Sequence, residues 1–132
     1  AMMAGWVQNH CIIGVCHALA HQLGQIDVPH GIANAIFLTH SIKWNKKTKE
    51  VEKRYEKLAR RSNIGNSSKD IIKLIESILS KNAFPFNLSY YIEDRKAEKD
   101  NLIVNALDDP GARYNPVNVD YNMLSNIWDS AL

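Results

Sequence analysis

Apolar residues recur at helical intervals along most of the chain, and no segment shows the strict alternation typical of a half-exposed strand. The first expected helix covers residues 2–23, which contain no proline and many good helix formers, and Gly24 is a natural stop. After a short connection at 24–29, we expect a second helix over about 30–44. Both helices are rich in apolar residues.

The remainder of the chain predicts four more helices. Residues 46–65 have an amphipathic pattern, and the next helix follows a capping Ser67 or Ser68. Helices are also expected over 93–107 and 120–132, and loops over 82–87 and 108–116. The helix after Ser68 is expected to bury a wide apolar face of Ile71, Ile72, Leu74, Ile75, Ile78 and Leu79. The pattern therefore predicts an all-α fold of about six helices, forming a single domain over residues 1–132.

The formal net charge is only +2, but the charges are unevenly distributed. Residues 1–42 contain no Lys or Arg and one acid, which predicts burial of the helix at 2–23. Residues 43–61 carry nine basic and three acidic residues, and residues 92–132 carry four basic and eight acidic ones. The basic run has no nucleic-acid-binding motif, so we expect a solvated helix face and no nucleic-acid partner.

Polar residues interrupt the uncharged start too often for a membrane span, and a basic leader region is missing, so neither a membrane helix nor a secretory signal is expected. Cys11 and Cys16 lie on roughly opposite sides of the expected helix, so we expect free thiols and a reducing, cytoplasmic location. The three tryptophans are expected to be core or half-buried packing residues; they are Trp6, Trp44 and Trp128.

All five histidines lie within residues 1–42. His17 and His21 are four residues apart, which places both rings on one face of a helix, one turn apart. His30 follows a short turn that can bring it back beside this pair. Imidazole is a frequent ligand of zinc and ferrous iron, but buried histidines are also common core residues, and the spacing alone leaves both interpretations open. Asp27, the one nearby acid, is expected to be a solvated loop residue.

The segment from Gly14 to Asn45 closely resembles the signature of the iron-containing alcohol dehydrogenase family. That signature is roughly G-x-x-H-x-x-A-H-x-x-G followed after a short gap by P-H-G-x-A-N-A. The matching residues here are Gly14, His17, Ala20, His21 and Gly24, then Pro29, His30, Gly31, Ala33, Asn34 and Ala35. The segment 106–116, ALDDPGARYNP, resembles a late A-x-x-D-P…N-P segment of the same family. The interval between His17 and His30 is one residue shorter than in the family pattern, which predicts a tighter turn before Pro29.

The resemblance implies roles for three histidines. His17 and His30 match metal-ligand positions, and His21 matches a histidine near the nicotinamide and the substrate that is implicated in catalysis. In such enzymes a divalent ion, Fe²⁺ or sometimes Zn²⁺, polarises the alcohol oxygen, and hydride passes to NAD or NADP. The substrate implied is a small alcohol or aldehyde.

The resemblance also implies a division of the protein. The family has an N-terminal α/β domain that binds the dinucleotide and supplies an Asp and a His to the metal, and the sequence has neither that domain nor a glycine-rich nucleotide loop. We therefore expect this chain to be the C-terminal helical domain of a dehydroquinate synthase-like, iron-containing alcohol dehydrogenase. Alone, it should bind metal weakly or not at all and be inactive.

Two other classes of function remain open on the residues alone. One is a non-catalytic helical interaction module whose basic helix meets an acidic partner, and the other is a self-contained metal-binding bundle built on histidines. Self-association through the apolar face of residues 1–42 is a further alternative, since exposed apolar patches favour homo-oligomers.

Overall fold

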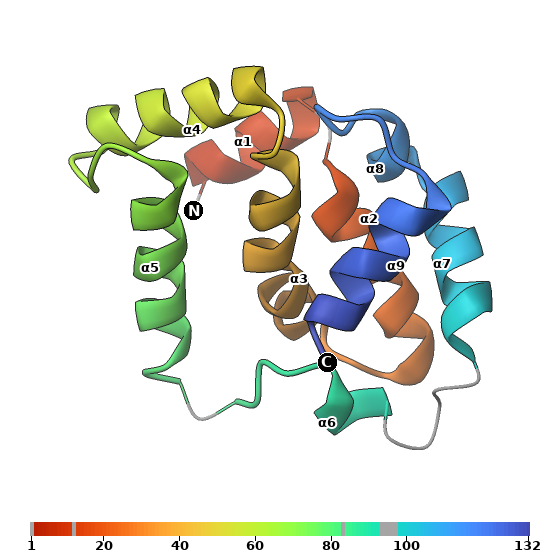
Figure 1. Cartoon of the computed structure of the whole chain (residues 1–132). Helices are drawn as coiled ribbons and strands as arrows, with labels where there is room; N and C mark the ends of the chain where they lie inside the picture. The colour runs from red at the N-terminus through yellow and green to blue at the C-terminus, as the bar shows by residue number, and fades with distance from the viewer. Residues whose placement is uncertain (1, 12, 83, 93–97) are drawn as a thin grey trace.

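A computed structural model describes residues 2–11, 13–82, 84–92 and 98–132, and among these residues every regular element is helical (Figure 1). The all-α prediction is thereby confirmed, with more and shorter helices than the six expected. In chain order the elements are α1 (Met2–Cys11), α2 (Val15–Leu23), the 3-10 turn η1 (Gly24–Ile26), α3 (His30–Asn45), α4 (Lys49–Arg61), α5 (Ser68–Leu79), α6 (Ser89–Ile92), α7 (Lys99–Asp108), α8 (Pro110–Arg113) and α9 (Tyr121–Ser130).

The main core lies among α2, α3, α7 and α9, which stand close together in Figure 1. The apolar face of α9 packs on α3, where the rings of Phe37 and Trp128 have centroids 5.8 Å apart. Asp120 caps α9, its carboxylate accepting a hydrogen bond of 2.7 Å from the Met123 N–H. This core holds α2 between α3 and α7 and so fixes the helix that carries His17 and His21.

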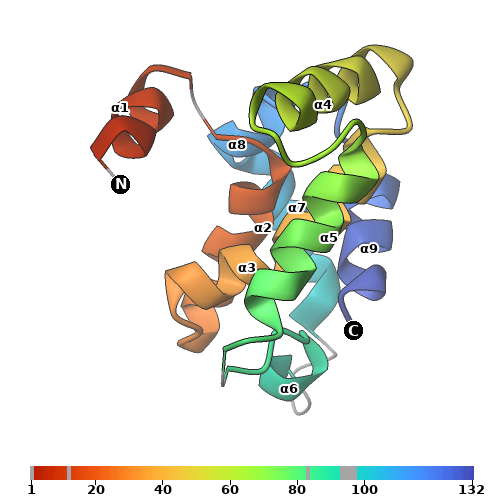
Figure 2. The same ribbon diagram turned by 90° about the vertical axis from the view of Figure 1, so that its left-hand side faces the viewer.

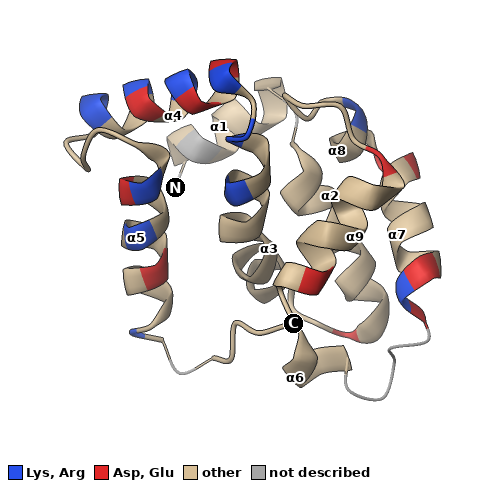
Figure 3. Ribbon diagram, in the orientation of Figure 1, with Lys and Arg blue, Asp and Glu red and all other residues tan. Residues whose placement is uncertain are grey.

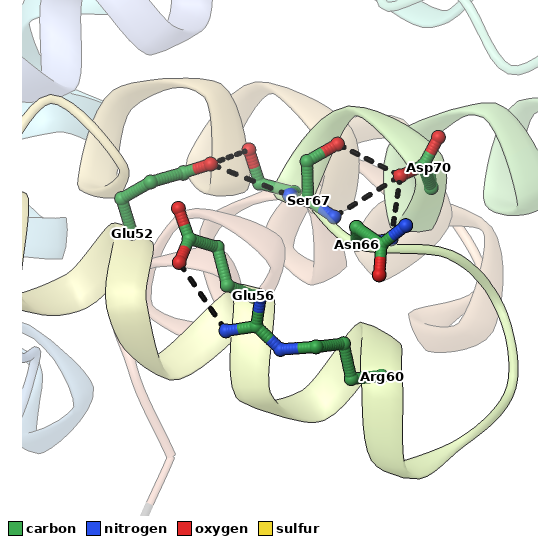
Figure 4. Close-up of polar contacts among 7 residues, drawn as sticks. Glu52, Glu56, Arg60, Asn66, Ser67 and Asp70 are labelled. Carbon is green, nitrogen blue, oxygen red and sulfur yellow. Dashed lines mark hydrogen bonds and ion pairs between the residues drawn. The ribbon is translucent and has the colours of Figure 1, made fainter.

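A second, smaller cluster joins α4 to α5 and contains Ile42, Ala59, Ile71 and Ile72. Polar contacts fix the corner between the two helices (Figure 4). Glu52 of α4 accepts a hydrogen bond of 2.9 Å from the Ser68 hydroxyl, and Asp70 accepts hydrogen bonds from the N–H groups of Asn66 and Ser67. The predicted apolar face of α5 is only half correct, because Leu74 and Ile78 are exposed.

The expectation of one buried helix over residues 2–23 is wrong. The helix is interrupted, and Gly14, with φ −110° and ψ −165°, is the extended residue that precedes α2. Figure 2 shows α1 standing apart from the rest of the chain. Met2, Met3 and Trp6 are exposed, so Trp6 is not a core residue, whereas Trp128 is buried and Trp44 half-buried as expected.

Two further features differ from the predictions. The helix expected over 93–107 begins at Lys99 in the structure, and residues 93–97 lie outside the described part of the chain. The described residues of the expected loop over 82–87 lie outside regular helices, and the expected loop over 108–116 contains the short α8. Pro110 explains α8, because proline is well suited to the first turn of a helix and Asp109 immediately before it caps the turn.

The charged residues lie mainly on the outer helices (Figure 3). Blue and red segments of the ribbon alternate along α4, as expected for the solvated helix that the basic run predicted, whereas α2 carries neither colour. No helix within the described residues has the length and apolar character that crossing a membrane requires.

Candidate functional site

The site is built where the chain reverses direction between α2 and α3. The 3-10 turn η1 is followed by Asp27, whose φ of 62° lies in the left-handed region. Asp27 is exposed, and it is the solvated loop residue expected. Pro29, with φ −55° and ψ 133°, then starts α3, so that His30 is its first residue. This reversal returns His30 to the helix face that carries His17 and His21.

The three histidine rings lie together. The ring centroids of His17 and His21 are 6.0 Å apart, and those of His17 and His30 are 5.4 Å apart. The rings of His21 and His30 are stacked, with a centroid separation of 5.4 Å and an interplanar angle of 19°. The predicted convergence of these side chains is confirmed. We call His17, His21 and His30 the histidine cluster.

The cluster lies at the surface but is partly shielded from solvent. His17 is half-buried, and burial is the main cause that lowers its pKa below the ordinary value of 6.5. Positive charge on His30 or His21 lowers this pKa further, while Asp109 acts in the opposite direction. His17 is therefore held in the neutral form, which is the form of imidazole that binds a metal.

Asn34 lies beside the cluster, one turn along α3 from His30. Its side-chain amide nitrogen is 3.0 Å from both the Nε2 and the carbonyl oxygen of His30. The Cys16 thiol donates to the Asn34 carbonyl oxygen at 3.4 Å. Burial raises the pKa of Cys16 to about 12, so that this group stays a thiol and is a poor metal ligand. Cys11 is exposed, and both thiols are free as expected.

Asp109 is the contact that the histidine spacing did not reveal. Its Oδ2 lies 2.8 Å from the Nδ1 of His21, although the two residues are 88 positions apart. The pattern predicts only a loop in its segment, ALDDPGARYNP, and the family resemblance alone points to a role for it. The distance is set by the packing of α8 on α2, which no local pattern encodes.

Asn115 anchors the first turn of α2 from the same late segment. Its side-chain oxygen accepts hydrogen bonds from the Val15 N–H at 3.4 Å and the Asn45 amide at 3.1 Å. Its amide nitrogen donates to the Asn45 side-chain oxygen at 2.9 Å and to the Val117 carbonyl at 2.9 Å. A side chain at Gly14 would approach Asn115 to 3.1 Å, which explains why a glycine fits there.

The other two histidines lie away from the cluster. His10 is on the exposed α1, where its Nδ1 is 2.7 Å from the Trp6 carbonyl oxygen. His40 is on α3, with its Nδ1 2.9 Å from the Ser130 hydroxyl of α9. Neither is in ring contact with the cluster, so the structure separates His17, His21 and His30 from the rest.

The donor chemistry of the cluster suits a divalent transition metal, because neutral imidazoles favour Zn²⁺ and Fe²⁺. Within the described residues, however, no group of three or more His, Cys, Asp or Glu side chains is arranged to hold an ion. The Nδ1 of His21 is already engaged by Asp109. The residues therefore fit part of a ligand set, with His17 and His30 as the two histidines that matched ligand positions in the sequence.

Comparison with known proteins identifies the family. The model of the Fe-containing alcohol dehydrogenase family, C-terminal, matches residues 1–132. The chain belongs to this family. An NADPH-dependent butanol dehydrogenase from Clostridium saccharobutylicum is 29% identical over 96% of this chain and 34% of its own length. An alcohol dehydrogenase from Thermococcus barophilus is also 29% identical, over 99% of this chain and 34% of its own length.

Solved structures agree with this assignment. An iron-containing alcohol dehydrogenase from Thermococcus thioreducens superimposes with a TM-score of 0.80 at 25% identity, over 89% of this chain and 31% of that one. A 1,3-propanediol oxidoreductase superimposes with a TM-score of 0.74 at 27% identity, over 90% and 32%. The chain thus has the helical fold of the family's C-terminal domain and spans about a third of the length of these relatives.

Proposed function

We propose that this chain is the metal-binding part of an NAD(P)-dependent alcohol dehydrogenase that interconverts small alcohols with aldehydes or ketones. The observation that carries the proposal is that the rings of His17, His21 and His30 lie together at the surface of a chain that belongs to this family. A cluster of imidazoles at a surface is suited to metal ligation and proton transfer.

His17 and His30 are the residues that would hold Fe²⁺ or Zn²⁺, together with ligands from outside this chain. The bound ion would supply Lewis acidity, which polarises an alcohol oxygen and favours its ionised form. Burial and the neighbouring imidazoles keep His17 uncharged, so its lone pair stays available near neutral pH. His30 is pre-positioned by its place at the start of α3.

His21 has a different environment from the two proposed ligands. Its Nδ1 faces the Asp109 carboxylate, and its side chain is 38% exposed, enough for a substrate or a water molecule to reach it. We assign to His21 the exchange of a proton with the substrate hydroxyl. The hydride acceptor, NAD or NADP, requires a nucleotide site that we expect from an N-terminal α/β domain.

The experiment is an activity assay of a fusion that joins this chain to the nucleotide-binding domain of the butanol dehydrogenase relative. Fe²⁺ or Zn²⁺, a primary alcohol and NAD⁺ or NADP⁺ are supplied, and cofactor reduction is followed by absorbance. We expect turnover that falls at least about 100-fold in His17→Ala and in His30→Ala, since loss of metal ligation removes the Lewis acid.

The matched control is His40→Gln, which changes a histidine of α3 outside the cluster and should leave turnover within about twofold of the parent. Turnover that survives both His17→Ala and His30→Ala would contradict the assigned metal ligands. A folded, metal-supplied fusion that oxidises no alcohol with either cofactor would contradict the proposed function as a whole.

A further inference from the structure

Asp109 occupies the junction of α7 and α8, and its carboxylate serves two partners with separate oxygens. Oδ1 accepts a hydrogen bond of 2.7 Å from the Gly111 N–H and so caps α8. Oδ2 faces the Nδ1 of His21 at 2.8 Å. The side chain of Asp109 is only 12% exposed, whereas the His21 side chain that it faces is 38% exposed. One carboxylate thus connects the local structure of α8 to a ring of the histidine cluster.

The backbone around Asp109 leaves the carboxylate little freedom. Pro110 follows it at the first position of α8, and α8 packs directly on α2. A side chain at Gly111 would come within 2.9 Å of the Gly14 carbonyl oxygen at the start of α2. This close approach of two glycines sets α8 against the helix that carries His21, and the cap then orients the second carboxylate oxygen.

The hydrogen bond between Asp109 and His21 determines which nitrogen of the His21 ring carries the proton. An ionised carboxylate only accepts hydrogen bonds, so the facing Nδ1 of His21 carries the proton. In the neutral ring, Nε2 is then the unprotonated nitrogen, free to accept a proton or a hydrogen bond. We propose that Asp109 is a positioning residue that holds His21 in its Nδ1–H tautomer and fixes the ring orientation in the histidine cluster. The importance of this tautomer for catalysis rests on the proposed function.

The competing interpretation is that Asp109 only caps α8. The two interpretations separate in Asp109→Asn, because asparagine is as good an N-cap as aspartate but has a single side-chain oxygen. With that oxygen on the Gly111 N–H, the amide NH₂ faces His21 and donates to Nδ1. The proton of the neutral ring must then move to Nε2.

The test is long-range ¹⁵N–¹H NMR of the histidine rings in the 132-residue chain, at a pH above the ordinary imidazole pKa. We expect the Nδ1 of His21 in the unchanged chain to resonate in the protonated, pyrrole-type region. In Asp109→Asn it should move to the unprotonated, pyridine-type region, while Nε2 makes the opposite move. Far-UV circular dichroism and the melting temperature should stay close to those of the unchanged chain, since the cap is kept.

Asp120→Asn is the matched control, because Asp120 is also an N-cap aspartate but caps α9, where its side chain accepts from the Met123 N–H. It should leave the His21 signals unchanged. In a second variant, Asp109→Ser, the side chain still caps α8 but is too short to reach the ring, and we expect both tautomers to be populated.

A His21 ring that shows the same tautomer in the unchanged chain, in Asp109→Asn and in Asp109→Ser would overturn the inference and leave Asp109 as a cap alone. That result would not affect the proposed function, which depends on turnover of the fusion and on His17 and His30. Conversely, an inactive fusion together with a tautomer switch in Asp109→Asn would contradict the proposed function and still support the positioning of His21 by Asp109.

Discussion

At the scale of single residues, the site depends on a few polar side chains that are distant in sequence. Asn115 is the clearest structural example, since its amide pairs reciprocally with that of Asn45 and also accepts from the first N–H of α2. Asn45 is only 5% exposed, so its amide has little access to water as an alternative partner. The geometry of the histidine cluster thus depends on an amide pair outside it.

We predict that Asn115→Ala lowers the free energy of unfolding by about 1–3 kcal/mol, because the buried Asn45 amide is left without its partner. Urea unfolding followed by circular dichroism measures this change. Asn118→Ala, on the exposed part of the same loop, is the control and should change stability by less than about 0.5 kcal/mol. Equal stability of the two variants would refute the anchoring role of Asn115.

The second residue-scale prediction concerns His40, whose pKa is lowered by burial and by Lys43, with Glu76 opposing. The folded state therefore favours neutral His40, and as the pH falls below the ordinary value of 6.5 the unfolded chain takes up a proton that the folded chain does not. Stability is fully present above that pH and is lost as the pH falls towards the lowered folded pKa. The lowered pKa of His17 makes stability fall in the same way as the pH decreases.

We expect His40→Gln to reduce this loss of stability, because glutamine does not titrate and can still hydrogen-bond Ser130. The measurement is urea unfolding of both proteins at neutral and mildly acidic pH. If the free energy of unfolding depends on pH identically in the two proteins, His40 does not contribute to the loss of stability at acidic pH.

At the scale of elements, the sequence patterns predict α3, α4, α5 and α9 at close to their observed positions, because turn or capping residues precede α3, α5 and α9 and the pattern of α4 is amphipathic. The pairing of His17 with His21 was equally predictable, since it follows from helical spacing alone. Asp109 was not predictable by spacing, because its approach to His21 depends on α8 packing against α2. The exposure of α1 was not predictable either, because a segment without charges has the composition of a buried helix whether or not a partner covers it.

The exposure of α1 leads to a prediction at this scale. Every residue of α1 whose side chain is described is exposed, so the helix contributes no residue to either core cluster. Removal of residues 1–11 should therefore change the free energy of unfolding of this chain by less than about 0.5 kcal/mol. Denaturant titration of the shortened chain tests this, and a loss of several kcal/mol would mean that α1 packs on the core.

At the scale of the whole molecule, the chain presents two proposed metal ligands and spans about a third of its relatives. We predict that the purified 132-residue chain catalyses no NAD- or NADP-dependent alcohol oxidation, even with Fe²⁺ or Zn²⁺ supplied. The reason is the expected division of the site, in which the dinucleotide and further ligands are held outside these residues. Cofactor reduction by this chain above the rate of a His17→Ala, His30→Ala double variant would contradict it.

The central claim, that His17 and His30 form one half of a metal site, is tested most directly by titrating Zn²⁺ into the isotope-labelled chain and following each histidine ring by NMR. Because two imidazoles leave the ion incompletely coordinated, binding should be weak and in fast exchange. The account predicts that the His17 and His30 signals move together and saturate first, that His10 and His40 stay in place, and that His17→Gln abolishes the movement of His30. Movement of His10 or His40 ahead of the cluster, or a His30 response that persists in His17→Gln, would contradict it.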